Sequence, residues 1–409
     1  MKKRLFSLVL ALTVAAGCLV GCGGSKSEKK ADATNSSEAG GEKILRVASE
    51  DPQVPLDMQL NTYSIIMKVT DNITESLLLT NEKGELEPTL LEEMPKLSDD
   101  KLTYSFTLKD GVTFHNDAPL TSNDVKYSLQ RMVRKYKMSS LLEKVEGYQA
   151  YFDEQADEIT GIEIVDDKHF NIHMSEVYTP FLSALSTPYC AIYPAEACEE
   201  AGDNWGMTVL YGTGPFKLVS YKTGVGVELT KNENYHGGDV KLDGIKYTFI
   251  DDPNTGVLEY QKGNIDVVYL DSSLYPTYAK GELKDELYSF NPVGGYYLNF
   301  NVNEVREAMT YAVDRKALCD SVLFGTAIPN SNFIQDGLIG ADDSAEQFEY
   351  DPEKAKEYLA ASGLNPAECT FSIICSDDTK LRAGQVIQSS LKENLGIDVT
   401  LESMDLATY

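Results

Sequence analysis

The chain has 409 residues, with 64 acidic side chains against 36 basic ones, which gives a formal net charge of −28 at pH 7. This charge disfavours nucleic acid as a partner, because binding phosphate groups needs concentrated positive charge. Four histidines are present, and no H-E-x-x-H, G-x-S-x-G or phosphate-loop motif occurs, so the usual hydrolase and NTPase motifs are missing.

The amino terminus is typical of an export signal. A basic start at Met1 to Arg4 precedes a weakly polar stretch from Leu5 to Val20. The sequence "LVGC" ending at Cys22 resembles a bacterial lipoprotein processing box more closely than "AAGC" ending at Cys18. We therefore predict a signal peptide over residues 1–21 and a lipid on Cys22, which would anchor the protein outside the cytoplasm on the bacterial cell membrane. A signal that is cut without lipid attachment is the alternative.

Residues 22–43 are predicted to form a flexible tether, because no apolar side chain larger than alanine follows Cys22 in this stretch. Beyond it, about 365 residues are too many for one core and indicate two lobes or more. The cysteines after Cys22 have no C-x-x-C spacing, so we predict small buried side chains, of which one pair could form a disulfide.

The first elements after the tether are a strand and a helix. Residues Ile44–Ser49 cluster apolar side chains as a strand does, and the four-residue spacing of Ile73 and Leu77 predicts a helix over residues 71–80. A second strand is predicted over residues 102–108, where apolar and polar side chains alternate. The turn dipeptide Asp110-Gly111 and the apolar residues at 112 and 114 then predict a hairpin.

A helix is predicted after this hairpin. Thr121 and Asp124 form a capping box, and an apolar stripe follows at residues 125, 129, 132 and 133. His115 and Asp117 lie just before it, and although such a pair could act as acid and base, a structural role is favoured for a histidine in a turn.

The glycine-rich segment 212–238 is predicted to be structural. Its residues 216–219 and 225–229 have strand patterns, with a turn at residues 222–224. A phosphate loop would need a helix directly after the glycines, and none is indicated. His236 and Glu233 could suggest a metal site, but the remaining ligands cannot be assembled from the sequence.

Further along, a helix is predicted around residues 257–260, with Asn254 or Thr255 as its cap, Gly263 as its end and a strand over residues 265–270. The aspartates at 251 and 252, with Asn254, lack the spacing of a calcium loop, so this stretch is predicted to be a helix cap and not a metal site. A later helix spans residues 305–325, and on one helix Arg306 and Arg315 would lie about 180° apart.

The last segment predicts a βαβ unit. A strand begins at residue 370, a helix covers residues 381–396 and a second strand covers residues 397–403. Asp377 and Asp378 follow the first strand, where ligands bind in such sheets, although both could simply cap the next helix.

Five sequence blocks occur in the order found in one known family. They are "SDDKLTYSFTLKDGVTFHNDAPLTSNDVKYSLQR", "GTGPFKLVSY", "LTKNENYHGG", "LEYQKGNIDVVYL" and "VREAMTYAVDRKAL". Together they resemble the extracytoplasmic solute-binding proteins of ABC importers, in the group that takes peptides and, in some members, nickel. The resemblance covers the chain from about residue 44 to residue 401.

The resemblance implies an α/β fold of the two-lobed, type II periplasmic-binding-protein kind. The first lobe would comprise residues 44–79 and 206–292, with an inserted subdomain at residues 80–205. The second lobe, residues 293–409, would be incomplete, because family members usually continue beyond the equivalent of Tyr409.

The resemblance also implies ligand-binding residues. Tyr296 and Tyr297 would lie on a strand along the cleft, unless they are only core aromatics. Arg306 and Arg315 would bind peptide carboxylates, with ion pairs to neighbouring acids as the alternative. The carboxylate of Asp378, with Asp377 beside it, would bind the terminal ammonium of a peptide.

The implied function is capture of extended peptides outside the membrane and delivery to an ABC permease with cytoplasmic ATPases. We expect a monomer without catalytic activity, cofactor or metal. A nickel, metal-chelate or other small-ligand binder of the same family is one alternative, and a peptide-signal sensor or an exported hydrolase are others.

Overall fold

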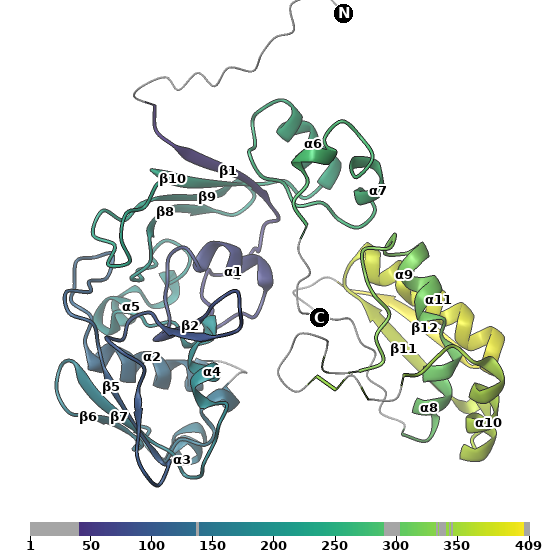
Figure 1. Ribbon diagram of the computed structural model, residues 1–409, viewed down its shortest axis with the longest axis horizontal. Coiled ribbons are helices and arrows are strands. Elements are labelled where there is room, and N and C mark those ends of the chain that lie inside the picture. The colour runs from purple at the N-terminus through teal and green to yellow at the C-terminus, as the bar shows by residue number, and fades with distance from the viewer. Residues whose placement is uncertain are drawn as a thin grey trace, which may run out of the picture. The chain divides into compact units, whose positions relative to one another are not determined.

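The computed structural model describes residues 41–135, 139–289, 303–332, 334, 341, 342, 344 and 347–404 (Figure 1). The predicted signal peptide, Cys22 and all but the end of the tether lie outside these ranges. Tyr296 and Tyr297 lie outside them as well.

The first sheet has four strands in the order β1-β10-β9-β8 (Figure 1). Their bounds are β1 (Ile44–Ser49), β8 (Phe216–Lys222), β9 (Gly226–Lys231) and β10 (Gly244–Phe249). β1 runs parallel to β10, and the other pairs are antiparallel. One face packs on the helix α1 (Ser64–Thr70) and on the buried side chain of Trp205. The antiparallel pairing of β8 with β9 confirms the hairpin predicted within the glycine-rich segment.

The second sheet is antiparallel, in the order β4-β5-β7-β6, and packs on the helix α2 (Ser122–Lys135). Its strands are β4 (Lys96–Leu97), β5 (Thr103–Thr107), β6 (Ile162–Ile164) and β7 (His169–His173). The predicted apolar stripe of α2 is buried here, and Asp124 accepts from the Thr121 N–H at 3.0 Å, as the capping box requires. Around this core lie β2 (Leu78–Thr80), β3 (Leu86–Pro88), α3 (Tyr148–Phe152) and α4 (Phe181–Leu185), whereas α5 (Ala195–Ala201) packs its buried Cys198 into the core of the first sheet.

Two short helices, α6 (Pro253–Gln261) and α7 (Tyr275–Tyr278), follow the first sheet in the chain. The described residues from 303 onward form a third core of their own. It contains α8 (Asn303–Ala312), α9 (Arg315–Ser321), α10 (Pro352–Ser362), β11 (Thr370–Cys375), α11 (Asp378–Leu395) and β12 (Asp398–Ser403). β11 and β12 are parallel, so the predicted βαβ unit is confirmed. The remaining described helices are single turns at residues 139–142, 188–190, 202–204, 284–286 and 366–368.

Two predictions in the amino-terminal half are wrong. A helix was expected over residues 71–80, but α1 ends at Thr70 and Leu78–Thr80 is a strand. The chain turns there because the backbone at Ile73 packs directly against Gly212 and Gly214. The second hairpin strand at residues 112–114 is absent from the described structure, since β5 pairs with β4 and β7, and Thr113 makes a single bridge to Pro119.

Three later predictions also need correction. The cap of α6 is Asp252, whose side chain accepts from the Thr255 N–H at 2.7 Å, and not Asn254 or Thr255. The strand expected over residues 265–270 is a single parallel bridge between Val47 and Val267. The helix expected over residues 305–325 is two helices, because Asp314 caps α9 by accepting from the Ala317 N–H at 2.9 Å.

Among the described residues the cysteines are free thiols, and Cys190, Cys198, Cys319 and Cys375 are buried. In the same ranges we find no helix with the length and apolarity needed to cross a membrane. The residue boundaries proposed for lobes and subdomain stay predictions.

Candidate functional site

Three parallel stretches of chain end together beside α1. Val47 on β1 bridges Val267 in parallel, and the Ala48 N–H donates to the Val267 carbonyl at 2.9 Å. On the other side of β1, the Ile250 N–H donates to the Ser49 carbonyl at 2.8 Å. In α/β sheets, ligands bind beyond the carboxyl ends of parallel strands. The residues that follow these strands are therefore candidates for a binding site.

Lys68, in the last turn of α1, lies against an aromatic ring at this strand end. Its Nζ atom is 3.9 Å from the centroid of the Tyr269 ring, within cation–π range. The ring belongs to the stretch that bridges β1, and Tyr269 is 49% exposed. Burial beside the ring lowers the pKa of the Lys68 ammonium, and the charge of Glu50 opposes that shift.

Asp71 follows Lys68 by one helical turn and is the C-cap residue of α1. Burial raises the pKa of its carboxyl group to about 6, so its charge is costly in this position. The Tyr247 hydroxyl donates to the Lys68 carbonyl at 2.8 Å, and burial, with the Tyr269 and Asp71 groups nearby, raises the pKa of its phenol. We call Glu50, Lys68, Asp71, Tyr247 and Tyr269 the strand-end cluster.

Sequence reasoning missed the strand-end cluster. The helix that carries Lys68 and Asp71 was placed several residues too late, and Tyr63 at its N-cap provides no side-chain capping bond. Tyr269 lies in a stretch that was predicted as an ordinary strand. The sequence offered only the aromatic Tyr269 directly after the apolar Val267 and Val268 as a signal.

The predicted acidic site shows two aspartates with different roles. Asp377 is the N-cap of α11: one carboxylate oxygen accepts from the Lys380 N–H at 2.8 Å, and the other lies 2.8 Å from the Lys380 ammonium. Burial acts to raise the pKa of Asp377, but these Lys380 interactions outweigh it and leave that pKa below its usual value. Asp378 is exposed in the first turn of the helix, at the carboxyl end of β11.

The two predicted arginines lie on separate helices, so the 180° argument does not apply to them. Arg315 starts α9, and its guanidinium donates to the Thr310 carbonyl at 2.9 Å and to the Phe348 carbonyl. Burial lowers the pKa of Arg315 from its usual value. Arg306 lies on the exposed side of α8.

The glycine-rich segment surrounds a buried carboxylate that the sequence analysis did not identify. Glu75 accepts from Thr213 Oγ1 at 2.7 Å and from the Tyr235 hydroxyl at 3.0 Å. His236 pairs with Glu75, with 2.7 Å between Nε2 and Oε2, and not with Glu233. No group of three or more potential metal ligands occurs within the described ranges. The segment therefore has a structural role around Glu75.

His115 is buried and bonded to the same segment. Its Nδ1 accepts from the Gly212 N–H at 3.3 Å, so its Nε2 carries the proton and donates to the Gly214 carbonyl at 2.9 Å. Burial lowers the pKa of His115 to about 4. Both ring nitrogens are engaged, which supports the predicted structural role.

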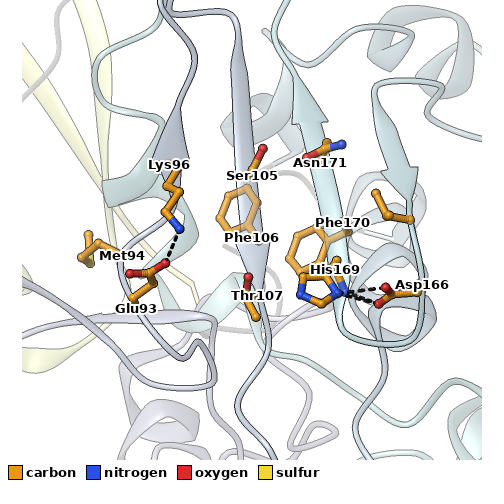
Figure 2. Close-up of a pocket in the computed structure, with 11 residues that line it drawn as sticks. Glu93, Met94, Lys96, Ser105, Phe106, Thr107, Asp166, His169, Phe170 and Asn171 are labelled. Atoms are coloured by element: carbon orange, nitrogen blue, oxygen red, sulfur yellow. Dashed lines mark hydrogen bonds and ion pairs between the residues drawn. The ribbon is translucent and has the colours of Figure 1, made fainter.

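A separate hollow of about 350 Å³ lies on the second sheet, outside the strand-end cluster (Figure 2). At one side Lys96 pairs with Glu93, and at the other the His169 Nδ1 atom lies 2.8 Å from Asp166 (Figure 2). Thr107 lies opposite His169 in the strand register. The charged side chains of the hollow are thus bonded to one another, Lys96 to Glu93 and Asp166 to His169.

Comparison with known proteins identifies the family. The group described as bacterial extracellular solute-binding proteins, family 5 Middle, matches residues 85–409. The chain belongs to this family. It is 28% identical to the oligopeptide-binding protein OppA of Bacillus subtilis, over 100% of this chain and 79% of that protein. It is 26% identical to the dipeptide-binding protein DppE of the same organism, over 98% of this chain and 78% of that protein.

Other members of this solute-binding family have different named ligands. The nickel-binding periplasmic protein of Escherichia coli is 26% identical, over 80% of this chain and 65% of that protein. Among solved structures, the murein tripeptide binding protein MppA of Escherichia coli has a TM-score of 0.78 at 24% identity, and the match covers 90% of this chain and 76% of MppA. This structural match confirms the predicted two-lobed α/β fold. The family is named for binding solutes and not for catalysis.

Proposed function

We propose that the protein is the substrate-binding component of an ABC importer that captures extended peptides outside the membrane and delivers them to a permease. The supporting observation is membership of the solute-binding family, together with relatives named for oligopeptide and dipeptide binding that span nearly the whole chain. Capture by hinge closure of two lobes requires no covalent chemistry.

Within this proposal, Asp378 binds the terminal ammonium of the peptide. Both aspartates are exposed after a strand end, but Asp377 already uses its two carboxylate oxygens on Lys380. A carboxylate in this place offers a charge-assisted hydrogen bond to an ammonium.

The other proposed contacts differ in their support. Arg306 and Arg315 are both proposed as partners of a peptide carboxylate, and the Arg315 guanidinium also donates to two backbone carbonyls of its own chain. Tyr296 and Tyr297 would pair with the peptide backbone as an added strand.

The proposed location is extracytoplasmic, with a lipid on Cys22, residues 22–43 as a tether, and a monomeric protein that meets its permease at the membrane. The proposed lobe boundaries are residues 44–79 and 206–292 for the first lobe, 80–205 for the inserted subdomain and 293–409 for the second lobe.

Native mass spectrometry of the chain from Ser25 onward, purified without denaturation, tests the function. We expect a set of bound peptides of mixed sequence that is reduced in Asp378→Asn. Asp398→Asn is the matched control, because Asp398 lies at the opposite end of the same parallel strands and pairs with Lys392 at 2.6 Å.

The same experiment separates the alternatives. A nickel or chelate adduct in place of peptides would favour the small-ligand binder, and shortened products from added peptides would favour a hydrolase. An empty protein that also fails to bind added peptides would contradict the proposal. Peptide import that is lost in cells without the protein distinguishes an importer component from a sensor.

A further inference from the structure

The strand-end cluster holds one of the protein's own cations on an aromatic ring. The Lys68 ammonium lies 3.9 Å from the Tyr269 centroid, and that ring remains 49% exposed where the parallel stretches end. An exposed tyrosine ring attracts ammonium and guanidinium groups through its negative face. The geometry is therefore that of a cation-binding site whose present occupant is tethered to the protein.

Negative charge lies near the Lys68 ammonium. The charge of Glu50 reaches Lys68 and favours its ammonium, while Asp71 stands on the same helix end. A helix C-terminus adds partial negative charge to this corner.

Only the side chain of Lys68 is free to leave, because its backbone is fixed. The Lys68 carbonyl accepts from the Tyr247 hydroxyl at 2.8 Å and from the Asn72 side-chain amide at 3.0 Å. The Asp71 N–H also bonds back to the Met67 carbonyl at 2.9 Å. Lysine has a flexible four-carbon stem, so its ammonium can swing into water without moving the helix.

We propose that Lys68 is a tethered occupant of a cation site, and that a basic side chain of a bound peptide, carrying an ammonium or guanidinium, replaces it on the Tyr269 ring. This inference rests on the proposed peptide-binding function. Lys68 then lowers the affinity for basic side chains, because the ligand must first displace it. Lys68 and Tyr269 are thereby specificity-determining residues.

Calorimetry on the full chain in mild detergent tests the preference. The probes are tetraalanine peptides with lysine at one position in turn, each paired with the norleucine peptide, which has a similar stem without the charge. In Lys68→Met we expect the lysine-over-norleucine affinity ratio to rise about three- to tenfold, as a cation–π contact permits. Lys68→Arg, which keeps the tethered cation, should leave the ratio near that of the wild type.

A double variant tests the ring. In Lys68→Met with Tyr269→Leu the gain should disappear, because leucine keeps an apolar body but has no negative face. An unchanged ratio in Lys68→Met overturns the inference. If Lys68→Met loses affinity only for acidic peptides, the inference is also overturned, because Lys68 would then bind ligand anions directly.

A readout without peptide separates this inference from the proposed function. In carbon-13 NMR of labelled lysine, the methylene signals of Lys68 should be shifted by the Tyr269 ring current, and the shift should vanish in Tyr269→Leu. Methylammonium chloride should reduce that shift more than sodium chloride at equal ionic strength. Equal responses to both salts would contradict a displaceable occupant, even if the protein binds no peptide at all.

Discussion

Glu75 and His236 lie 161 positions apart in the sequence, yet His236 Nε2 is 2.7 Å from a Glu75 carboxylate oxygen. Both side chains are nearly buried, at 9% and 10% exposure for Glu75 and His236. Thr213 and Tyr235 add two further hydrogen bonds to the same carboxylate. This pair fixes the glycine-rich segment onto the start of the second core.

Replacing Glu75 should therefore destabilise the protein strongly. Glu75→Ala leaves the Thr213, Tyr235 and His236 donors without their shared acceptor, and we expect a loss of about 3 kcal/mol in the free energy of unfolding. Urea unfolding followed by the fluorescence of Trp205, the single tryptophan, measures this change. A loss below about 0.5 kcal/mol, the size expected for an exposed carboxylate, would contradict the structural role.

The buried His115 predicts a pH dependence of stability. Its pKa is about 4 in the folded protein, lowered mainly by burial from an ordinary 6.5, so the unfolded chain binds more protons between these values. Stability from this group is complete above pH 6.5 and is lost as pH falls towards 4, by about 3 kcal/mol in total. Urea unfolding at several pH values measures the slope.

The variant His115→Gln isolates this effect. Asp71 titrates in an overlapping range with the opposite sign, because burial raises its pKa to about 6 and its protonated form is favoured in the folded state. The difference in the free energy of unfolding between wild type and His115→Gln removes the Asp71 contribution, because both proteins contain Asp71. If this difference is independent of pH between 4 and 6.5, the assignment of a neutral His115 is wrong.

A buried ion pair connects α2 to the chain before α1. The Arg131 guanidinium lies 2.7 Å from Asp57, and these side chains are 10% and 0% exposed. Arg131→Met leaves an unpaired buried carboxylate, and we expect a loss of about 3–5 kcal/mol. Denaturant unfolding compares it with Lys316→Met, which breaks the exposed pair to Asp320 and should cost no more than about 1 kcal/mol. Similar losses in the two variants would refute this distinction.

Gly212 is required by close backbone packing. A Cβ atom added there would lie 2.1 Å from the Ile73 carbonyl oxygen, so Gly212→Ala should push the glycine-rich segment away from residue 73 and cost about 1–3 kcal/mol. Gly41→Ala is the control, since nothing lies within 4 Å of its added Cβ. Thermal unfolding of the two variants should show a clear drop in Tm for Gly212→Ala alone, and equal Tm values would disprove the packing argument.

Short-range patterns in the sequence determined the elements that depend on neighbouring residues. The alternation in β5, the capping box of α2, the hairpin of β8 and β9, and the βαβ unit at residues 370–403 were all predictable, because each pattern repeats within one strand or helix. The ordered sequence blocks also indicated the family. For the proposed acidic site, the sequence offered both Asp377 and Asp378 but did not show that Asp377 is the N-cap of α11.

The tertiary structure alone decided which distant residues meet. The Lys43 backbone N–H donates to the Asp243 carboxylate, 200 positions away in the sequence, and β1 pairs with β10 in the first sheet. The helix expected at residues 71–80 gave way to packing against the glycine-rich segment, and Lys68 of the helix that does form contacts Tyr269. The physical reason is that periodicity reports which face of an element is apolar, whereas sheet register and backbone packing select its partners.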